Sequence, residues 1–129
     1  MSRAHTQAAV AVALLLLTLP LAGAAAAARK PTATEVTAIR FALAHDARTC
    51  CARPESRVTG IVVSTADPQF STAEVQRLDK SGRVLGVTDA LLWRGTKRWA
   101  VIDAGSDAIG CGFVSAKVRR DLFGTALCP

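Results

Sequence analysis

The residues of this sequence that are best suited to chemistry are its four cysteines, two of them adjacent as Cys50 and Cys51, and the nearby His45. A catalytic cysteine needs a base within hydrogen-bonding distance and surroundings that favour the thiolate. A zinc site takes ligands at paired spacings such as C-x-x-C, whereas the side chains of adjacent cysteines point in different directions. No such pattern surrounds Cys50 and Cys51, so we expect no catalytic residue, no metal site and no cofactor.

The first 28 residues have the order of segments that is typical of a cleaved signal peptide. Arg3 supplies a positive start, Ala8 to Leu19 is an apolar run interrupted by Thr18, and Pro20 then breaks the run. The alanines at 24–28 provide several A-x-A cleavage sites. We therefore predict a signal peptide over residues 1–28 and a single secreted domain over residues 29–129, with no stable membrane span after cleavage. The alternative is an uncleaved N-terminal membrane anchor.

In a short exported chain, an even number of cysteines predicts disulfide bonds in preference to a metal or catalytic site. We expect a crossed pairing first, in which Cys50 and Cys51 are each joined to one of Cys111 and Cys128. A Cys111–Cys128 bond that leaves Cys50 and Cys51 outside it ranks second. A bond between the two adjacent cysteines, which would strain the backbone, ranks last.

The positive charge of the chain indicates which classes of partner it could bind. The formal net charge is +6, and Arg3 is the only charged side chain within the signal peptide. The remaining basic residues include four small groups, which are Arg29–Lys30, Arg53/Arg57, Lys97–Arg98 and Lys117/Arg119/Arg120. These groups suit an anionic cell-wall polymer or an exported protein, or they keep the surface solvated. They lack the aromatic interleaving of a nucleic-acid binder, so we expect no nucleic-acid partner.

The hydrophobic periodicity predicts an α+β domain. Apolar residues at helical spacing indicate a helix over Ala33–Ala47, and the preceding "TATE" at 32–35 fits a capping box. The period then changes to two, which predicts strands over 57–65, 70–78 and 83–87 and a hairpin over 89–105. A short C-terminal helix begins at Ser115 and ends near Gly124. We expect the N-terminal helix to pack on a small antiparallel sheet of three to five strands, stapled by disulfides.

Two strands carry specific expectations about which side chains share a face. Strict alternation puts Ile61 and Val63 on one side of the first strand and Val58 and Val62 on the other.

In the hairpin, a three-residue loop over Gly95–Lys97 would set Trp93 opposite Trp99 and Leu91 opposite Val101. Two paired indoles would form a flat platform for sugar rings or for an apolar side chain of a partner. Alternatively, the indoles fill the core of a chain that has few other large side chains.

These features favour a non-catalytic, exported binding or interaction module that acts at the cell envelope or in the medium. Its expected contact surface is the hairpin, with Trp93, Lys97, Arg98 and Trp99. The alternative is a small enzyme or ligand-pocket protein with a site near His45 or Asp103. A chain of this size leaves little room for a deep pocket beside its core.

The C-terminal half contains stretches that match a known pattern, namely "VSTADPQF" at 63–70 and "WAVIDAGSDAIGCGFVSAKVRRDLFGTALC" at 99–128. The chain resembles a group of uncharacterised small exported proteins of high-GC Gram-positive bacteria. Their pattern runs V-S-x-x-D-P, W-x-V-x-D-x-G-S, G-C-G, V-x-x-D-L and a last cysteine, and it covers about half of the mature chain. The resemblance implies export and structural roles for Cys111 and Cys128, and it implies no activity, substrate or cofactor.

Overall fold

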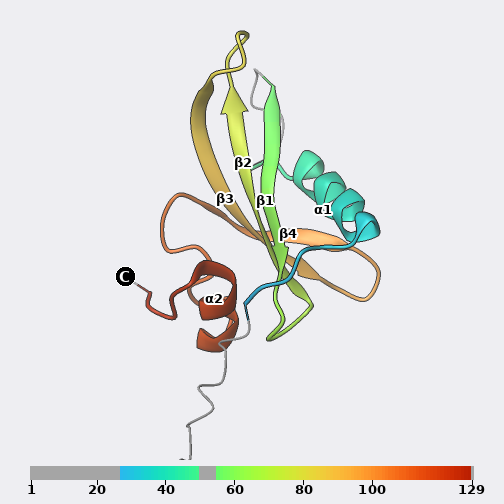
Figure 1. Cartoon of the computed structure of the whole chain (residues 1–129), viewed down its shortest axis with the longest axis vertical. Coiled ribbons are helices and arrows are strands. Elements are labelled where there is room, and N and C mark those ends of the chain that lie inside the picture. The colour runs from blue at the N-terminus through green and yellow to red at the C-terminus, as the bar shows by residue number, and fades with distance from the viewer. Residues whose placement is uncertain (1–26, 50–54, 129) are drawn as a thin grey trace, which may run out of the picture.

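A computed structural model describes residues 27–49 and 55–128 of the chain. Its elements form a four-stranded antiparallel sheet in the order β1-β2-β3-β4, with a helix before it and a helix after it (Figure 1). In chain order the elements are α1 (Ala33–His45), β1 (Ser56–Val63), β2 (Phe70–Leu78), β3 (Val84–Arg94), β4 (Trp99–Gly105) and α2 (Ala116–Phe123). The α+β class, the antiparallel sheet and the presence of a disulfide are as predicted.

Helix α1 begins at the predicted capping box. The Thr32 hydroxyl accepts a hydrogen bond from the Glu35 backbone N–H at 3.2 Å, and the Glu35 carboxylate accepts one from the Thr32 N–H at 2.9 Å. These two bonds satisfy donors that no helical carbonyl can reach. The helix ends at His45, two residues before the predicted Ala47, because Asp46 already has an extended backbone.

The main core lies between α1 and one face of the sheet. It contains Ile39, Ala42 and Leu43 of α1 together with residues from every strand, which are Val63, Ala73, Val75, Ala90, Leu92, Trp99 and Val101. Burial of this apolar surface is what holds the helix on the sheet, at about 25 cal/mol for each Å² removed from water.

Strand β1 departs from strict alternation at Gly60. Its pairing with β2 shifts between Thr59 and Val62, and Gly60 has a φ of +60° that a side chain would disfavour. As a result Val58 lies against the same core as Ile61. The prediction that Val58 and Ile61 occupy opposite faces is therefore wrong, because a β-bulge resets the alternation.

Strand β3 is longer than predicted. The segment 83–87 and the first strand of the hairpin form one 11-residue strand, because Thr88 and Asp89 continue the pairing with Val75 and Glu74 of β2. Strand β4 pairs with only the second half of β3, from Asp89 to Arg94.

Helix α2 covers part of the opposite face of the sheet. It has the predicted cap at Ser115, whose hydroxyl accepts from the Val118 N–H at 3.3 Å, and it ends before Gly124. Leu91, Ile109 and Val118 are buried on this side. Gly110 has a φ of +80°, and a Cβ there would lie 3.3 to 3.5 Å from side chains of Phe123, Val114 and Leu91. A glycine is therefore required where this turn meets α2.

The disulfide joins Cys111 to Cys128 across 17 positions, with Cα atoms 5.8 Å apart. The crossed pairing that ranked first is therefore wrong. The turn after β4 and the tail after α2 meet because the buried Arg119 donates hydrogen bonds to the carbonyls of Ile109 and Leu127. A disulfide that closes a loop of this length stabilises the fold by about 3 kcal/mol in the chain-entropy model, because it lowers the entropy of the unfolded chain. Cys50 and Cys51 lie outside the described residues.

The carboxylate of Asp121 attaches α2 to the loop between β1 and β2. Its Oδ2 accepts hydrogen bonds from the Ser64 hydroxyl at 2.7 Å and from the backbone N–H groups of Thr65 at 2.7 Å and Ala66 at 3.1 Å. Burial of the group opposes ionisation, but these donors outweigh it and keep the pKa of Asp121 below its usual value. This contact between two segments that are distant in the sequence was not predicted.

Replacement of Asp121 by Ala is expected to lower the free energy of unfolding by about 2 kcal/mol, since several donors would lose a charged acceptor. Urea denaturation at neutral pH measures this change. Asp107→Asn is the matched control, because Asp107 is exposed and its carboxylate has only one long contact, to the Ser106 hydroxyl at 3.4 Å. The control should change stability by less than about 0.5 kcal/mol. Equal losses in the two variants would contradict the role assigned to Asp121.

Candidate functional site

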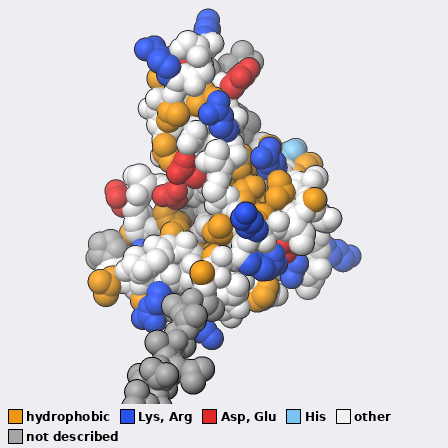
Figure 2. All heavy atoms as spheres, viewed as in Figure 1, with side chains coloured by type: hydrophobic (Ala, Val, Ile, Leu, Met, Phe, Trp, Pro, Cys, Tyr) orange, Lys and Arg blue, Asp and Glu red, His pale blue; other side chains and the backbone are white. Residues whose placement is uncertain are grey.

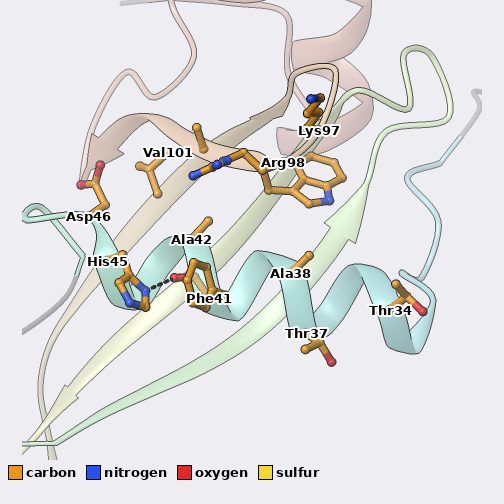
Figure 3. Close-up of a pocket in the computed structure, with 12 residues that line it drawn as sticks. Thr34, Thr37, Ala38, Phe41, Ala42, His45, Asp46, Lys97, Arg98 and Val101 are labelled. Carbon is orange, nitrogen blue, oxygen red and sulfur yellow. Dashed lines mark hydrogen bonds between the residues drawn. The ribbon is translucent and has the colours of Figure 1, made fainter.

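An apolar groove of about 730 Å³ lies between α1 and β4 (Figure 3). Helix α1 forms one wall, and β4 with the preceding hairpin loop forms the other. The lining residues are Thr34, Thr37, Ala38, Phe41, Ala42, His45 and Asp46 from α1 and its end, and Lys97, Arg98, Trp99, Ala100 and Val101 from the hairpin.

One exposed and one buried aromatic side chain line the groove. Phe41 is 62 % exposed, whereas Trp99 is 5 % exposed and belongs to the core. The ring of His45 stacks on Phe41 with centroids 4.0 Å apart, and its Nδ1 lies 2.8 Å from the Phe41 carbonyl oxygen. These contacts fix His45 against the helix and leave the outer face of Phe41 to solvent.

The ends of the groove differ in charge. Lys97 and Arg98 lie at the hairpin end, and Figure 3 shows the Arg98 side chain extending over the groove. At the other end Asp46 binds the Arg48 guanidinium at 2.9 Å, which lowers the pKa of Asp46. Within residues 27–49 and 55–128, no carboxylate lies within ion-pairing distance of Lys97 or Arg98. The surface around the apolar side chains over α1 is therefore basic (Figure 2).

Strand β4 is the last strand of the sheet, and no other described strand pairs with its outer edge beside the groove. The Gly95 N–H donates to the Arg98 carbonyl at 3.1 Å, so the loop of the hairpin consists of the two residues Thr96 and Lys97. Because backbone groups alternate in direction along a strand, Trp99 and Val101 direct their N–H and C=O groups away from β3. Arg48 donates to the carbonyls of Val101 at 2.7 Å and Ile102 at 3.3 Å. This contact caps part of the edge.

The predicted pairing of the two indoles is wrong. Trp93 is opposite Ala100, and Trp99 is opposite Arg94, because the loop is shorter than predicted. Leu91 is opposite Asp103 and not Val101, since Ile102 is an extra residue in β4.

Trp93 and Trp99 consequently lie on opposite faces of the sheet. Trp93 is 41 % exposed and lines a separate shallow hollow of about 380 Å³ with Phe70, Ile102 and Phe113. Of the four residues expected on one contact surface, Lys97, Arg98 and Trp99 line the groove and Trp93 does not.

The two residues of the alternative catalytic hypothesis are not brought to one site. His45 lines the groove. Asp103 lies farther along β4, where its Oδ2 accepts the Gly110 N–H at 2.7 Å and so supports the turn before α2. No group of three or more potential metal ligands occurs in the part of the chain that the structure describes.

The contribution of α1 to this site was not predicted from the sequence. Thr34, Ala38, Phe41 and His45 recur at spacings of three and four residues, so they form a second stripe on the helix beside the one that faces the core. An aromatic residue within such a second stripe was the available signal for an exposed apolar surface.

Comparison with known proteins gives no match, since no family model, no curated protein and no solved structure is similar to the chain. In the described residues, neither helix has the length and apolar character needed to cross a bilayer.

Tryptophan fluorescence provides a test of the corrected hairpin. In Trp93→Phe the remaining Trp99 should have blue-shifted emission that acrylamide quenches poorly, because its ring is buried. In Trp99→Phe the remaining Trp93 should have red-shifted emission and a quenching constant several times larger. Acrylamide is neutral, so the nearby basic residues do not bias it. Similar quenching in both variants would contradict the placement of the indoles on opposite faces.

The start of α1 beside the groove is held by an ion pair. The Arg29 guanidinium donates two hydrogen bonds to the Glu35 carboxylate, at 2.8 and 2.9 Å, and Arg94 lies 4.0 Å from the same group. The bond from Arg29 lowers the pKa of Glu35 from 4.5 to about 2, although burial opposes the shift and the Thr32 N–H assists it.

Glu35→Gln is expected to lower the free energy of unfolding by about 1 to 2 kcal/mol at pH 6. The folded-state pKa is depressed, so the contribution is complete above pH 4.5 and is lost as the pH falls towards 2. The difference between the wild type and Glu35→Gln, measured by urea denaturation, should therefore shrink over this range. Glutamine retains an acceptor for the capping box. A difference independent of pH would refute the assigned ion pair.

Proposed function

We propose that the protein is a non-catalytic, exported binding module and that the groove between α1 and β4 is its contact surface. The observation that carries this proposal is the exposed ring of Phe41 above an apolar floor, with Lys97 and Arg98 at one end. Exposed aromatic side chains in concave apolar surfaces are typical of residues that dominate binding energy in protein interfaces. Basic residues beside them select partners with complementary charge.

The partner that fits this surface is an exported protein that offers an apolar side chain flanked by acidic residues. An anionic cell-wall polymer would engage Lys97 and Arg98, but it would leave the apolar floor and the Phe41 ring unused. Catalysis has no support from the groove, because the only described ionisable side chains that line it are His45, Asp46, Lys97 and Arg98. Asp46 is held by Arg48, and His45 is stacked on Phe41.

The test uses the immobilised, oxidised mature protein to retain components of the producer's envelope and secreted fractions. We expect Phe41→Ser to abolish retention of the partner without loss of stability, since Phe41 is largely exposed. Phe113→Ser is the matched control, because Phe113 is 54 % exposed and lines the hollow on the opposite face. This control should retain the partner as well as the wild type does.

Salt dependence separates the two classes of partner. Retention of a protein should survive moderate salt, because apolar contacts are not screened. Retention of a wall polymer that disappears in moderate salt, and that is insensitive to Phe41→Ser, would overturn the proposal in favour of a purely electrostatic role.

A further inference from the structure

We infer that the groove binds its partner by β-strand addition, in which an acidic, extended segment of the partner pairs with the open edge of β4. This inference rests on the proposed function and specifies the chemistry of the partner. It requires free backbone groups on β4, a space of suitable length beside them, and charge complementarity. In the described residues, the outward backbone groups of Trp99 have no strand partner and the groove lies beside them. Lys97 and Arg98 are the charges that an acidic segment would complement.

The backbone groups come from alternate residues of β4. Trp99 directs both its N–H and its C=O outward, and Val101 directs its N–H outward, because the pairing with Arg94 and Leu92 is of the non-hydrogen-bonded kind. The Val101 carbonyl is already bound by Arg48 at 2.7 Å. The addition is therefore limited to a short segment that begins near the hairpin and stops at Arg48.

The length of the groove matches a short extended peptide. The stripe on α1 from Thr34 to His45 covers eleven helical steps, or about 16 Å. An extended chain spans this distance in about five residues. Alternate side chains of the added strand would face α1 and contact Ala38 and Phe41, so the segment needs apolar residues two positions apart.

The charge of the segment follows from the hairpin end of the groove. Lys97 and Arg98 have no carboxylate within ion-pairing distance in the described part of the chain, whereas Glu35 and Asp46 are each held by an arginine. An acidic residue of the partner would meet two cations there and encounter no competing free carboxylate of the groove.

The opposite edge of the sheet is less suited to addition. On β1, Val63 exchanges backbone hydrogen bonds at 2.8 and 2.9 Å with Arg29, which lies before α1 in the chain. The bulge at Gly60 also interrupts that edge. On β4, no described segment pairs with the outer edge between Trp99 and Val101, and the bulge at Ile102 lies beyond this stretch.

The experiment selects binders from a library of random eight-residue peptides displayed on phage, with the oxidised mature protein as the target. We expect selected peptides to carry an acidic residue near one end and apolar residues at alternate positions. The charge-reversal variant Lys97→Glu/Arg98→Glu should select basic residues at that same position. Phe113→Ser, on the opposite face, should select the same peptides as the wild type.

The pairing itself is tested by N-methylation of the best synthetic peptide. A methyl group on the peptide nitrogen that donates to the Trp99 carbonyl should weaken binding about tenfold, the worth of one hydrogen bond that contributes about 1.4 kcal/mol. A methyl group on the adjacent nitrogen, which points away from β4, should have little effect. Binding should also slow hydrogen exchange of the Trp99 amide.

Two results would overturn strand addition. The first is that N-methylation at any position leaves the affinity of the selected peptides unchanged. The second is that the library yields no peptide whose binding is abolished by Phe41→Ser. If the pull-down still depends on Phe41, the proposed function survives either result and only the mode of binding is rejected. Loss of the Phe41 dependence in the pull-down as well would reject both.

Discussion

The packing of Ile39 and Leu43 against the sheet is the constraint on which the rest of the structure depends. Both side chains are almost fully buried, and they fix the rotation of α1 about its own axis. Once that rotation is fixed, helix geometry determines where every other residue of α1 points. Phe41 and His45 must then lie over the outer side of the helix beside β4. The groove is thus a consequence of how the core is filled.

The opposite layer is organised by polar contacts and a covalent bond. Asp121 holds the loop at Ser64, Arg119 joins the turn at Ile109 to the tail, and the disulfide closes the same region. The segments 63–68 and 118–122, which the sequence analysis singled out as V-S-x-x-D-P and V-x-x-D-L, contribute to these contacts, since they contain Ser64 and Asp121. Asp103 and Gly110, from two further stretches, also bind each other. Most of the pattern therefore has a structural explanation on the α2 side.

Local signals in the sequence were sufficient for the secondary structure. The capping box at Thr32, the N-cap at Ser115 and the period-two segments all act through neighbouring residues, and they predicted the starts of both helices and the strand β2. They did not predict that the segment 83–87 and the first strand of the hairpin form one strand. Single extra residues in β1 and β4 were not predictable, because a bulge depends on what the opposing strand requires. Each bulge reversed the face of the residues beyond it. The indole pairing failed for a different reason, because the hairpin loop has two residues and not three.

The cysteine pairing and the groove depend on contacts between segments that are distant in sequence. Nothing around Cys111 distinguishes Cys128 from the earlier cysteines until α2 folds back through Arg119. The groove likewise needs the relative position of α1 and the β4 edge, which only the core packing provides. The basic residues Lys97 and Arg98 were found from sequence, whereas their apolar neighbour Phe41 was not.

The Arg48 guanidinium has a consequence for the solution behaviour of the domain. It occupies the Val101 and Ile102 carbonyls while Asp46 holds it in place. Because Arg48 occupies these carbonyls, a strand of a second molecule cannot form backbone hydrogen bonds along the full length of this edge. One side chain thus divides the edge into a portion beside the hairpin that it leaves uncovered and a portion that it blocks. The ion pair between Asp46 and Arg48 therefore opposes growth of the sheet from one molecule into the next.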